Sequence, residues 1–337
     1  MPGLTFDNVV VGGFALCRVL TSGVAEMGVV VDGVAYSLSA ALGSDVGSAE
    51  VLFPEWDMHL DRLQTWSDAV RAGQAEASPL PPEAKVLPPL EPRNVFQAAA
   101  NYRKHVIDLM VASPRPEHVG LDEPGRRAVA IALMDKRASS GTPTVFSGLP
   151  SSMTGAYGFV AIPRITRQCD WELELAAVMG RSARYVDEGS ALDLVAGYTI
   201  VNDITMRDRL YPGRDSKRGA DWLACKSAPT FLPTGPLLVP ARFVPDPGRL
   251  TITLRLNGEV MQEESTADMI FGLPRLIEHT SHCAQLLPGD LLLTGSPAGN
   301  GVHHGRFLRA GDVMEGQITG LGVQRTPCVD EEIGAFA

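Results

Sequence analysis

The sequence is short of the features that mark secreted, membrane-spanning and nucleic-acid-binding proteins. Its five cysteines are widely spaced and form no Cys-x-x-Cys pair, which argues against a disulfide framework and favours a reducing compartment. No run of 18 uncharged apolar residues is present, so no membrane-spanning helix is predicted. No basic run is present either, and the formal charge of -10 argues against a nucleic-acid partner. Without the pattern of a signal peptide, we expect a cytoplasmic protein.

The composition that is present is that of a globular protein, with 45% hydrophobic and 20% charged residues. A chain of 337 residues can bury a large core and suggests two domains or one large one. Residues 1–78 predict a small β-rich N-terminal domain with a hairpin at Asp32-Gly33 and a helix from Trp56 to Ala72. The proline-rich segment 79–92 predicts an extended linker, which leaves residues 93–337 as a second domain.

The stretch from Asp170 to Gly180 places two acidic residues ahead of an apolar run. As a continuous β-strand it would carry Glu172 and Glu174 on one face, roughly 7 Å apart. Carboxylates that enter a core repel each other and lose hydration, at a cost on the order of several kcal/mol per ion. A divalent cation held by oxygen atoms would neutralise them. A solvated acidic face is the alternative, and this stretch alone favours neither interpretation.

A second stretch favours the cation. The apolar run 194–201 predicts a buried strand that ends at Asp203, where a third oxygen ligand is expected. Arg207, four residues beyond, can serve as a countercharge or clamp an anion. Lys226 lies among small and apolar residues, and a buried lysine normally has a partner or a task.

At this point the chain resembles the fumarylacetoacetate hydrolase family, over residues 93–329. Each motif is weak alone, but their order and spacing together are specific. The motifs are Asn101-Tyr102-x-x-His105, Glu172-x-Glu174-Leu175-Ala176, Gly197-Tyr198-Thr199-x-x-Asn202-Asp203-x-x-x-Arg207-Asp208, Lys226-Ser227, Asn257-Gly258, Pro288-Gly289-Asp290 and Thr294-Gly295-Ser296-Pro297-Ala298-Gly299.

The resemblance implies a mainly β fold with some α (α+β), in which a mixed β-roll catalytic domain follows a small N-terminal domain, usually in a homodimer. It implies that Glu172, Glu174 and Asp203 bind Mg²⁺, or alternatively Mn²⁺ or Ca²⁺. It also implies that Lys226 lies beside the substrate and that His105 is the catalytic histidine. From the residues alone, His105 is more simply a packing or surface histidine.

The chain departs from the family pattern at two positions. Asp108 stands where members commonly have Glu, three residues after the histidine, and its shorter side chain has less reach to hold the imidazole. Ser296 stands where Thr is usual, but it keeps the hydroxyl. Gly295 and Ser296, with Tyr102 and Arg207, are therefore expected to bind the substrate.

The surrounding segments carry further predictions. Residues 109–145 contain a predicted helix from Glu123 to Arg137 and are well placed to form a lid. Asn257-Gly258 predicts a hairpin, and residues 269–287 predict a helix that Pro274 interrupts. His303 and His304 lie in a glycine-rich loop, where a surface position is expected and a position near the site is the alternative.

Together these residues predict a metal-dependent hydrolase that cleaves a C–C bond in an acylpyruvate or β-diketone, in the catabolism of aromatic or cyclic compounds. The partner would be a small dicarbonyl or carboxylate molecule. On the same site, an oxaloacetate-type decarboxylase or a 2-hydroxymuconate-type isomerase is an alternative. A third alternative, from another class, is a non-catalytic binding protein that retains the fold.

Overall fold

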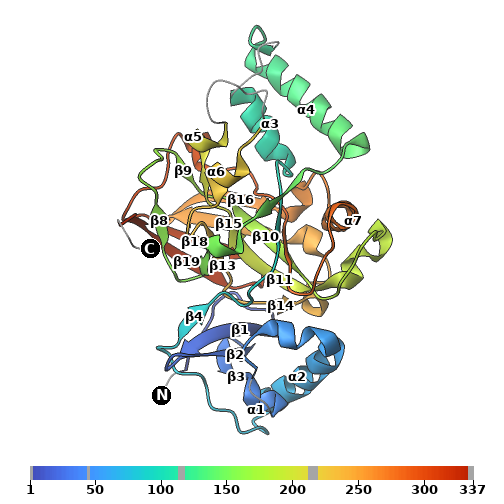
Figure 1. Cartoon of the computed structure of the whole chain (residues 1–337), viewed down its shortest axis with the longest axis vertical. Coiled ribbons are helices and arrows are strands. Elements are labelled where there is room, and N and C mark those ends of the chain that lie inside the picture. Colours follow the sequence, from blue (N-terminus) through green and yellow to red (C-terminus); the bar gives the residue numbers. More distant parts are fainter. Residues whose placement is uncertain (1–2, 44–45, 113–117, 212–218, 333–337) are drawn as a thin grey trace.

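The structure is a computed structural model that describes residues 3–43, 46–112, 118–211 and 219–332. As predicted, it is an α+β fold dominated by sheets. A small N-terminal unit lies at one end of the molecule, and helices α3 (Arg103–Ala112) and α4 (Glu123–Ser140) lie at the other (Figure 1). The sheets that carry the site residues lie between these two ends.

The N-terminal unit is a four-stranded sheet in the order β3-β2-β1-β4, accompanied by two helices. Asp32 and Gly33, with φ of 49° and 85°, form the predicted hairpin turn between β2 and β3, because both turn positions need positive φ. The helix predicted from Trp56 to Ala72 is confirmed as α2. The bounds are β1 Phe14–Thr21, β2 Val24–Val31, β3 Val34–Ser37, α1 Leu38–Leu42, α2 Trp56–Arg71 and β4 Lys85–Leu87.

The range predicted to be a linker contributes to this sheet. Strand β4 lies within residues 79–92 and pairs antiparallel with β1. The backbone of Leu16 in β1 also exchanges two hydrogen bonds of 2.8 Å with Leu238 of the larger part. Side chains from both parts share one buried apolar cluster, in which Phe14 and Leu16 pack with Val178 and Leu293. The N-terminal unit is thus bonded to the part that carries the site.

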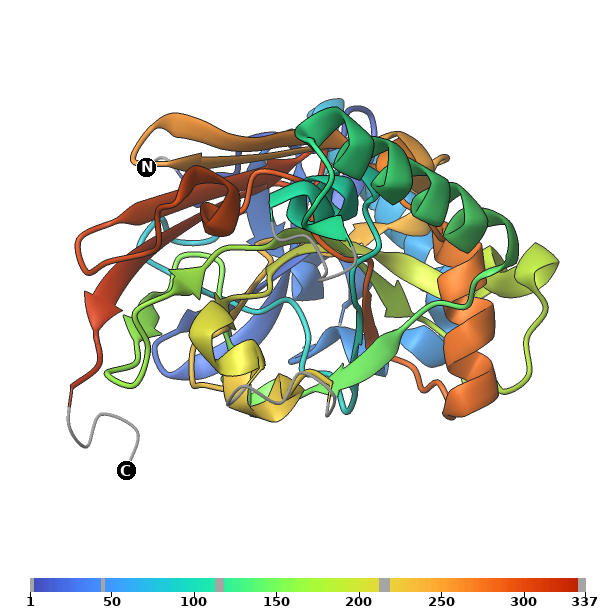
Figure 2. The same cartoon turned by 90° about the horizontal axis from the view of Figure 1, so that it is seen from above.

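The larger part contains an eight-stranded sheet and a five-stranded sheet. The first runs β6-β5-β17-β10-β11-β13-β7, with β14 also paired to β11, and the second runs β16-β15-β18-β19-β8. Four strands of the five-stranded sheet, β15, β16, β18 and β19, are orange to red and lie along one side of the molecule in Figure 2. The strands are β5 Val95–Ala98, β6 Val145–Gly148, β7 Met153–Gly155, β8 Val160–Ile162, β9 Cys169–Asp170, β10 Leu173–Met179, β11 Val195–Asn202, β12 Thr205–Met206, β13 Leu232–Thr234, β14 Val239–Pro240, β15 Thr251–Leu256, β16 Glu259–Ser265, β17 Leu291–Leu293, β18 Val313–Ile318 and β19 Val323–Asp330.

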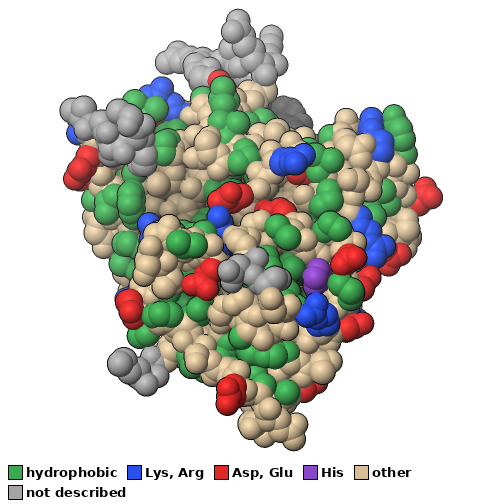
Figure 3. Space-filling model, turned by 60° about the horizontal axis from the view of Figure 1, so that its bottom comes forward, with side chains coloured by type: hydrophobic (Ala, Val, Ile, Leu, Met, Phe, Trp, Pro, Cys, Tyr) green, Lys and Arg blue, Asp and Glu red, His purple; other side chains and the backbone are tan. Residues whose placement is uncertain are grey.

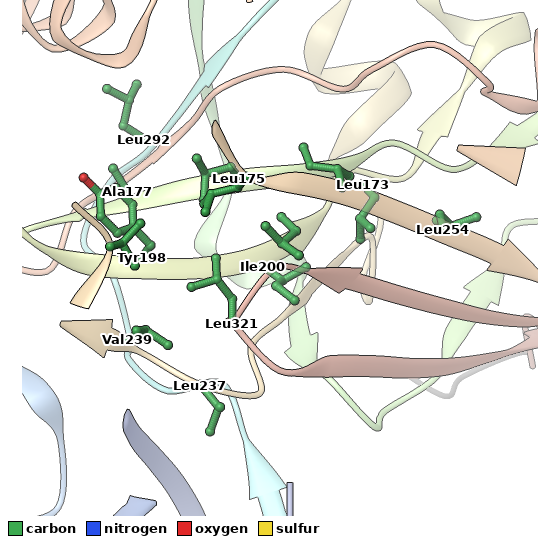
Figure 4. Packing of buried hydrophobic residues seen from close by; sticks show 14 of the residues in the cluster. Leu173, Leu175, Ala177, Tyr198, Ile200, Leu237, Val239, Leu254, Leu292 and Leu321 are labelled. Carbon is green, nitrogen blue, oxygen red and sulfur yellow. The ribbon is translucent and has the colours of Figure 1, made fainter. Parts of the chain in front are cut away.

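Strands β10 and β11 form the centre of the core. Every residue of both strands is buried, because the eight-stranded sheet is covered on both faces here. Leu173, Leu175 and Ile200 point toward Leu254 of β15 and toward Leu321 (Figure 4). Burial on both faces explains why the sequence reads as a nearly continuous apolar run around its few acidic residues.

The prediction of one continuous strand from Asp170 is wrong at its start. Asp170 belongs to β9, which pairs with β12, and β10 begins only at Leu173. Between them, Trp171 donates its indole hydrogen to the Gly299 carbonyl (3.0 Å). The Glu172 amide donates to the Asn202 side chain (2.9 Å) instead of to a backbone carbonyl of a neighbouring strand. The chain therefore changes sheets at Trp171 and Glu172, so that Glu172 precedes β10 and Glu174 lies within it.

The remaining helices match the sequence in kind and differ in length. The helix predicted from Glu123 to Arg137 extends to Ser140 as α4. The helix predicted over residues 269–287 is the shorter α7. Pro274 does not interrupt it but lies in its first turn, where proline is tolerated. The Asn257-Gly258 hairpin joins β15 and β16 as predicted. The other helices are α5 Arg207–Leu210, α6 Trp222–Lys226, α7 Leu273–Cys283 and α8 Gly301–His304.

On the outside, charged side chains of both signs are interspersed with hydrophobic ones over the face that Figure 3 shows. A search of the helices in the described ranges finds none with the length and apolar character needed to cross a bilayer.

Asn101 supports the start of α3 and gives a test of the fold. Its buried side chain donates to the Phe271 and Thr294 carbonyls (3.0 and 2.9 Å) and accepts from the Phe271 amide (3.0 Å). We expect Asn101→Ala to lower the free energy of unfolding by about 3 kcal/mol, because it leaves buried backbone groups unpaired. Lys104→Ala, which removes an exposed ion pair with Glu264, should cost less than about 1 kcal/mol. Urea denaturation measures both, and equal losses would contradict this role.

Candidate active site

Three carboxylates meet at the point where β10 begins and β11 ends. Oxygen atoms of Glu172, Glu174 and Asp203 all lie within 4.8 Å of one another, and all three residues are buried. The pairing of β10 with β11 explains this, because Leu173 lies opposite Asn202 and so places Glu172 beside Asp203. The Asp203 amide donates to the Glu172 carbonyl (2.8 Å), which holds the two together.

Two cations, the buried Lys226 and the partly buried Arg207, face these carboxylates. The Lys226 ammonium donates to Glu172 Oε2 (2.8 Å), to Asp203 Oδ2 and to the Thr205 hydroxyl (2.7 Å). The Arg207 guanidinium donates to Glu172 Oε1 (2.5 Å). Sequence reasoning found both basic residues, and the structure brings both to the acidic cluster. In these contacts they bind the protein's own carboxylates.

Asp170 is a buried member of this cluster that sequence reasoning missed. Its carboxylate accepts from Arg207 Nε (2.8 Å) and from the Gly301 and Val302 amides at the start of α8 (2.5 and 3.3 Å). The available signal was its place two residues before Glu172. It links the acidic cluster to the loop after Gly299.

Negative charge exceeds positive charge in this cluster. Four buried carboxylates, those of Asp170, Glu172, Glu174 and Asp203, face only Lys226 and Arg207 among the described residues, which leaves two negative charges unbalanced. Burial, and then the Asp203 and Glu172 carboxylates, raise the pKa of Glu174 well above its usual range. Burial would also raise the pKa of Glu172, but Arg207 and Lys226 outweigh it and lower that pKa.

These residues fit a divalent cation. Carboxylate oxygens are the ligands that hard cations such as Mg²⁺ prefer. Asp203 Oδ1 is buried and has no hydrogen-bond partner within the described ranges, which is unusual for a buried carboxylate oxygen. A doubly positive ion would contact the unpaired Asp203 oxygen, and it would balance the two excess negative charges of the cluster. The geometry and charge of the cluster thus support divalent-metal binding.

The acidic cluster lines a cavity of about 140 Å³ together with several other predicted site residues. His105, Arg207, Lys226 and Ser296 also line it. Its wall includes the stacked rings of Phe146 and Trp222, whose centroids are 4.1 Å apart. A larger hollow of about 720 Å³ elsewhere contains none of these residues. We place the site at the smaller cavity because the residues with strongly shifted pKa values converge there.

His105 reaches the cavity from the first turn of α3. Burial lowers its pKa to about 3, with Arg207 and His303 adding to the shift and Glu172 opposing it. Its ring is therefore neutral at neutral pH. Asp108, one turn further along α3, pairs with Arg127 of α4 (3.1 Å) and does not line the cavity.

Helix α4 holds α3 in place over the cavity. Besides the Asp108 pair, Asp135 of α4 binds Arg103 at the start of α3. Arg137 donates to the Ala100 carbonyl (2.6 Å). Ala100 has a φ of 51°, a conformation that costs about 1–3 kcal/mol for a residue other than glycine and that persists where its surroundings enforce it. Whether residues 109–145 close as a lid stays a prediction, and residues 113–117 lie outside the described ranges.

Two of the predicted substrate-binding residues, Tyr102 and Gly295, are not among the described residues that line the cavity. The ring of Tyr102 is fully buried and does not line it, because Tyr102 forms a backbone bridge to Met269 beneath α3. Gly295 uses its amide to donate to Glu174 Oε2 (2.7 Å). Ser296 does line the cavity, and its hydroxyl accepts from Gln262 (2.9 Å). Gly295 thus orients a carboxylate of the acidic cluster in this structure.

Comparison with known proteins identifies the family. The family model described as "Fumarylacetoacetate (FAA) hydrolase C-terminal" matches residues 94–329, which is more than half of the chain. The chain belongs to the fumarylacetoacetate hydrolase family. The resemblance found in the sequence is confirmed.

Its relatives in this family carry several activities in their names. The mitochondrial oxaloacetate tautomerase of Bos taurus is 39% identical over 183 residues, which are 54% of this chain and 57% of that protein. The 2,4-didehydro-3-deoxy-L-rhamnonate hydrolase of Sphingomonas sp. SKA58 is 41% identical over 188 residues, 54% of this chain and 64% of that protein. The match therefore spans about half of this chain and less than two thirds of either relative.

A solved structure shows that the fold is shared along nearly the whole chain. The maleylpyruvate hydrolase from Sphingobium sp. SYK-6, in complex with manganese(II) ion and pyruvate, superposes with a TM-score of 0.68 at 22% identity. The superposition covers 94% of this chain and all of that one. Members of the family thus act as hydrolases and tautomerases on one type of fold.

Metal binding can be tested by thermal unfolding. We expect saturating Mn²⁺ to raise the Tm of the wild-type protein by several degrees, because a ligand that binds only the folded state stabilises it. Glu174→Ala should fold with an unchanged or higher Tm without metal, since it removes a buried carboxylate with a raised pKa. Its Mn²⁺-dependent rise should vanish. Glu264→Gln, at the exposed pair with Lys104, should keep the full rise. A full rise in Glu174→Ala would exclude Glu174 as a ligand.

Proposed function

We propose that this chain is a divalent-metal-dependent hydrolase that cleaves the C–C bond of an acylpyruvate or related β-diketone. One observation carries the proposal: the neutral ring of His105 lines the same cavity as the acidic cluster of Glu172, Glu174 and Asp203. A base and a metal-binding cluster in one cavity are the two parts that this reaction needs. The non-catalytic alternative is less well supported, because it leaves the convergence of these groups without a purpose.

A divalent cation held by the three carboxylates would polarise a carbonyl oxygen of the substrate. His105 would take one proton from a water molecule, whose oxygen then bonds to the carbonyl carbon. The C–C bond breaks, and its electron pair passes to the departing carbon as an enolate. The Lys226 ammonium would donate a hydrogen bond to the enolate oxygen. The protonated His105 then returns its proton to that carbon, which completes the cycle.

Lys226 must exchange a partner for this to happen. An ammonium has three donors, and in this structure Glu172, Asp203 and Thr205 accept from them. When the two carboxylates bind a cation instead, the Lys226 donors become free to meet the substrate. Arg207, which holds Glu172 and Asp170, would orient a ligand of the cation, while a substrate carboxylate would meet the Ser296 hydroxyl.

Two reactions without water are the second candidates. A relative that is 39% identical is named an oxaloacetate tautomerase, and tautomerisation needs only proton transfer at carbon. Loss of CO₂ from oxaloacetate would form the same type of enolate. All three reactions can use the acidic cluster, His105 and Lys226, so assays with the different substrates distinguish them. We further propose a cytoplasmic location, which rests on the wide spacing of the cysteines. That the protein is a homodimer, that it uses Mg²⁺, or alternatively Mn²⁺ or Ca²⁺, and that it acts in the catabolism of aromatic or cyclic compounds rest on the resemblance alone.

The proposal is tested by assaying acetylpyruvate, fumarylpyruvate and oxaloacetate with Mg²⁺ or Mn²⁺. We expect acetylpyruvate to yield acetate and pyruvate. His105→Ala should lower kcat by about 10²–10⁴, the usual contribution of a general base, because His105 is the only histidine among the described residues that line the cavity. Oxalate, an enolate mimic, should bind both proteins equally. Conversion of oxaloacetate alone, with or without release of CO₂, would replace the hydrolase by a decarboxylase or a tautomerase.

A further inference from the structure

A second histidine lies beside the ring of His105, although it is not among the described residues that line the cavity. The ring centroid of His303, in α8, lies 5.3 Å from that of His105, with the ring planes at 53°. Both ring nitrogens of His303 and Nδ1 of His105 are buried without a hydrogen-bond partner in the described part of the chain. Buried polar atoms are almost always paired, so three unpaired nitrogens beside each other indicate a small polar molecule between the rings. The prediction that His303 lies at the surface is therefore wrong.

The backbone around His303 is built to hold its position. The Asp170 carboxylate accepts from the Gly301 and Val302 amides at the start of α8. A Cβ atom on Gly301 would come within 2.2 Å of the Arg306 carbonyl oxygen and 2.7 Å of Asp170 Oδ1, so only glycine fits there. Because Asp170 also binds Arg207, His303 is placed relative to the acidic cluster.

The adjacent His304 points elsewhere and provides a natural control. Its ring stacks on Trp171 with centroids 6.4 Å apart, and its Nε2 lies 3.3 Å from the Met261 carbonyl oxygen. Two neighbouring histidines in one short helix therefore have different surroundings. His303 lies beside His105, whereas His304 packs against Trp171 and the backbone of Met261.

Asp108 is not available to bind His105 because Arg127 binds it, and His303 lies beside His105. Asp108 stands where the family pattern has a partner for the catalytic histidine, but Arg127 binds it. Burial lowers the pKa of His303, and the Asp108 charge is the main influence that opposes this shift. Both histidine rings are thus neutral, and a neutral imidazole offers one acceptor nitrogen and one donor.

We propose that His303 is a further residue of the active site, which holds, together with His105, the water molecule that attacks the substrate carbonyl. This inference rests on the proposed hydrolase function. Two hydrogen bonds of about 2.8 Å each can bridge nitrogens up to about 5.6 Å apart, which is compatible with rings whose centroids lie 5.3 Å apart. In the step, His105 takes one proton of the water, and the other O–H donates to the acceptor nitrogen of His303. The oxygen lone pair forms the new C–O bond, and His303 neither gains nor loses a proton.

This role makes His303 a determinant of hydrolysis as opposed to tautomerisation. A tautomerase moves a proton on carbon and needs no attacking water, whereas a hydrolase loses rate when its water is poorly oriented. A residue that holds only the water should therefore affect hydrolysis and leave enolisation of a keto acid unchanged. The two activities can be measured on the same protein.

The experiment compares His303→Ala and His303→Gln with His304→Ala in the full-length, Mn²⁺-loaded protein. For each we would measure kcat and KM for acetylpyruvate hydrolysis and the exchange of the pyruvate methyl hydrogens with D₂O. We expect His303→Ala to lower the hydrolytic kcat about tenfold or more, with KM and exchange unchanged. His303→Gln, whose amide oxygen can accept the same hydrogen bond, should recover part of the rate. His304→Ala should stay within about twofold of the wild type.

Three results would overturn the assignment: an unchanged kcat in His303→Ala, an equal loss of exchange, or a rise in KM, which would mean that His303 binds substrate. A wild-type protein that does not hydrolyse acetylpyruvate would instead defeat the proposed function. In that case a high-resolution crystal structure with Mg²⁺ decides on His303 separately. An ordered oxygen within hydrogen-bond distance of both rings supports the shared water, and a direct contact between the rings excludes it.

Discussion

The excess of buried negative charge at the start of β10 is the constraint on which the rest of this site depends. Asp170, Glu172, Glu174 and Asp203 enter the core within a short distance of Lys226 and Arg207, and two cations cannot neutralise four carboxylates. Burying unpaired charge is among the most costly arrangements in a protein. Such an arrangement is stable when a further positive charge, or protonation, compensates it.

The fold serves this constraint by bringing distant segments to one place. The pairing of β10 with β11 juxtaposes Glu172 and Asp203, and the change of sheet before Leu173 frees Glu172 to turn toward Lys226. The chain after Gly299 returns to the cluster through the bonds between Asp170 and α8. On the opposite side, α4 fixes α3 and hence His105. The acid–base groups and the acidic cluster are therefore carried by separate elements, each with its own anchors.

Much of this was predictable from residue patterns, and the failures have physical causes. The acidic trio could be predicted because alternation along a strand and the end of the next apolar run mark where carboxylates enter a core. The break between Asp170 and Leu173 could not, since alternation does not reveal when a strand changes its pairing partner. The surroundings of Tyr102 and His303 could not be predicted for a related reason. They depend on contacts from distant segments, such as the backbone bridge between Tyr102 and Met269 and the bonds of Asp170 with α8.

The division of roles between the two histidines connects the chemistry of this chain to the variety of its family. Relatives of this chain are named as hydrolases and as tautomerases, and the proposed role of His303 would place one difference between these activities in the groups that hold water. Here the carboxylate expected beside His105 is bound by Arg127, and an imidazole faces His105 instead. Both groups, Arg127 of α4 and His303 of α8, lie outside the trio of Glu172, Glu174 and Asp203.

The central claim is that the acidic trio exists to hold a divalent cation. Anomalous diffraction from crystals grown with Mn²⁺ tests it most directly, because the signal locates the ion itself. The account predicts one strong peak about 2.1 Å from carboxylate oxygens of Glu172, Glu174 and Asp203, with the Lys226 ammonium moved off those oxygens. A fully occupied Lys226 contact with no peak among the three carboxylates, at saturating Mn²⁺, would contradict it.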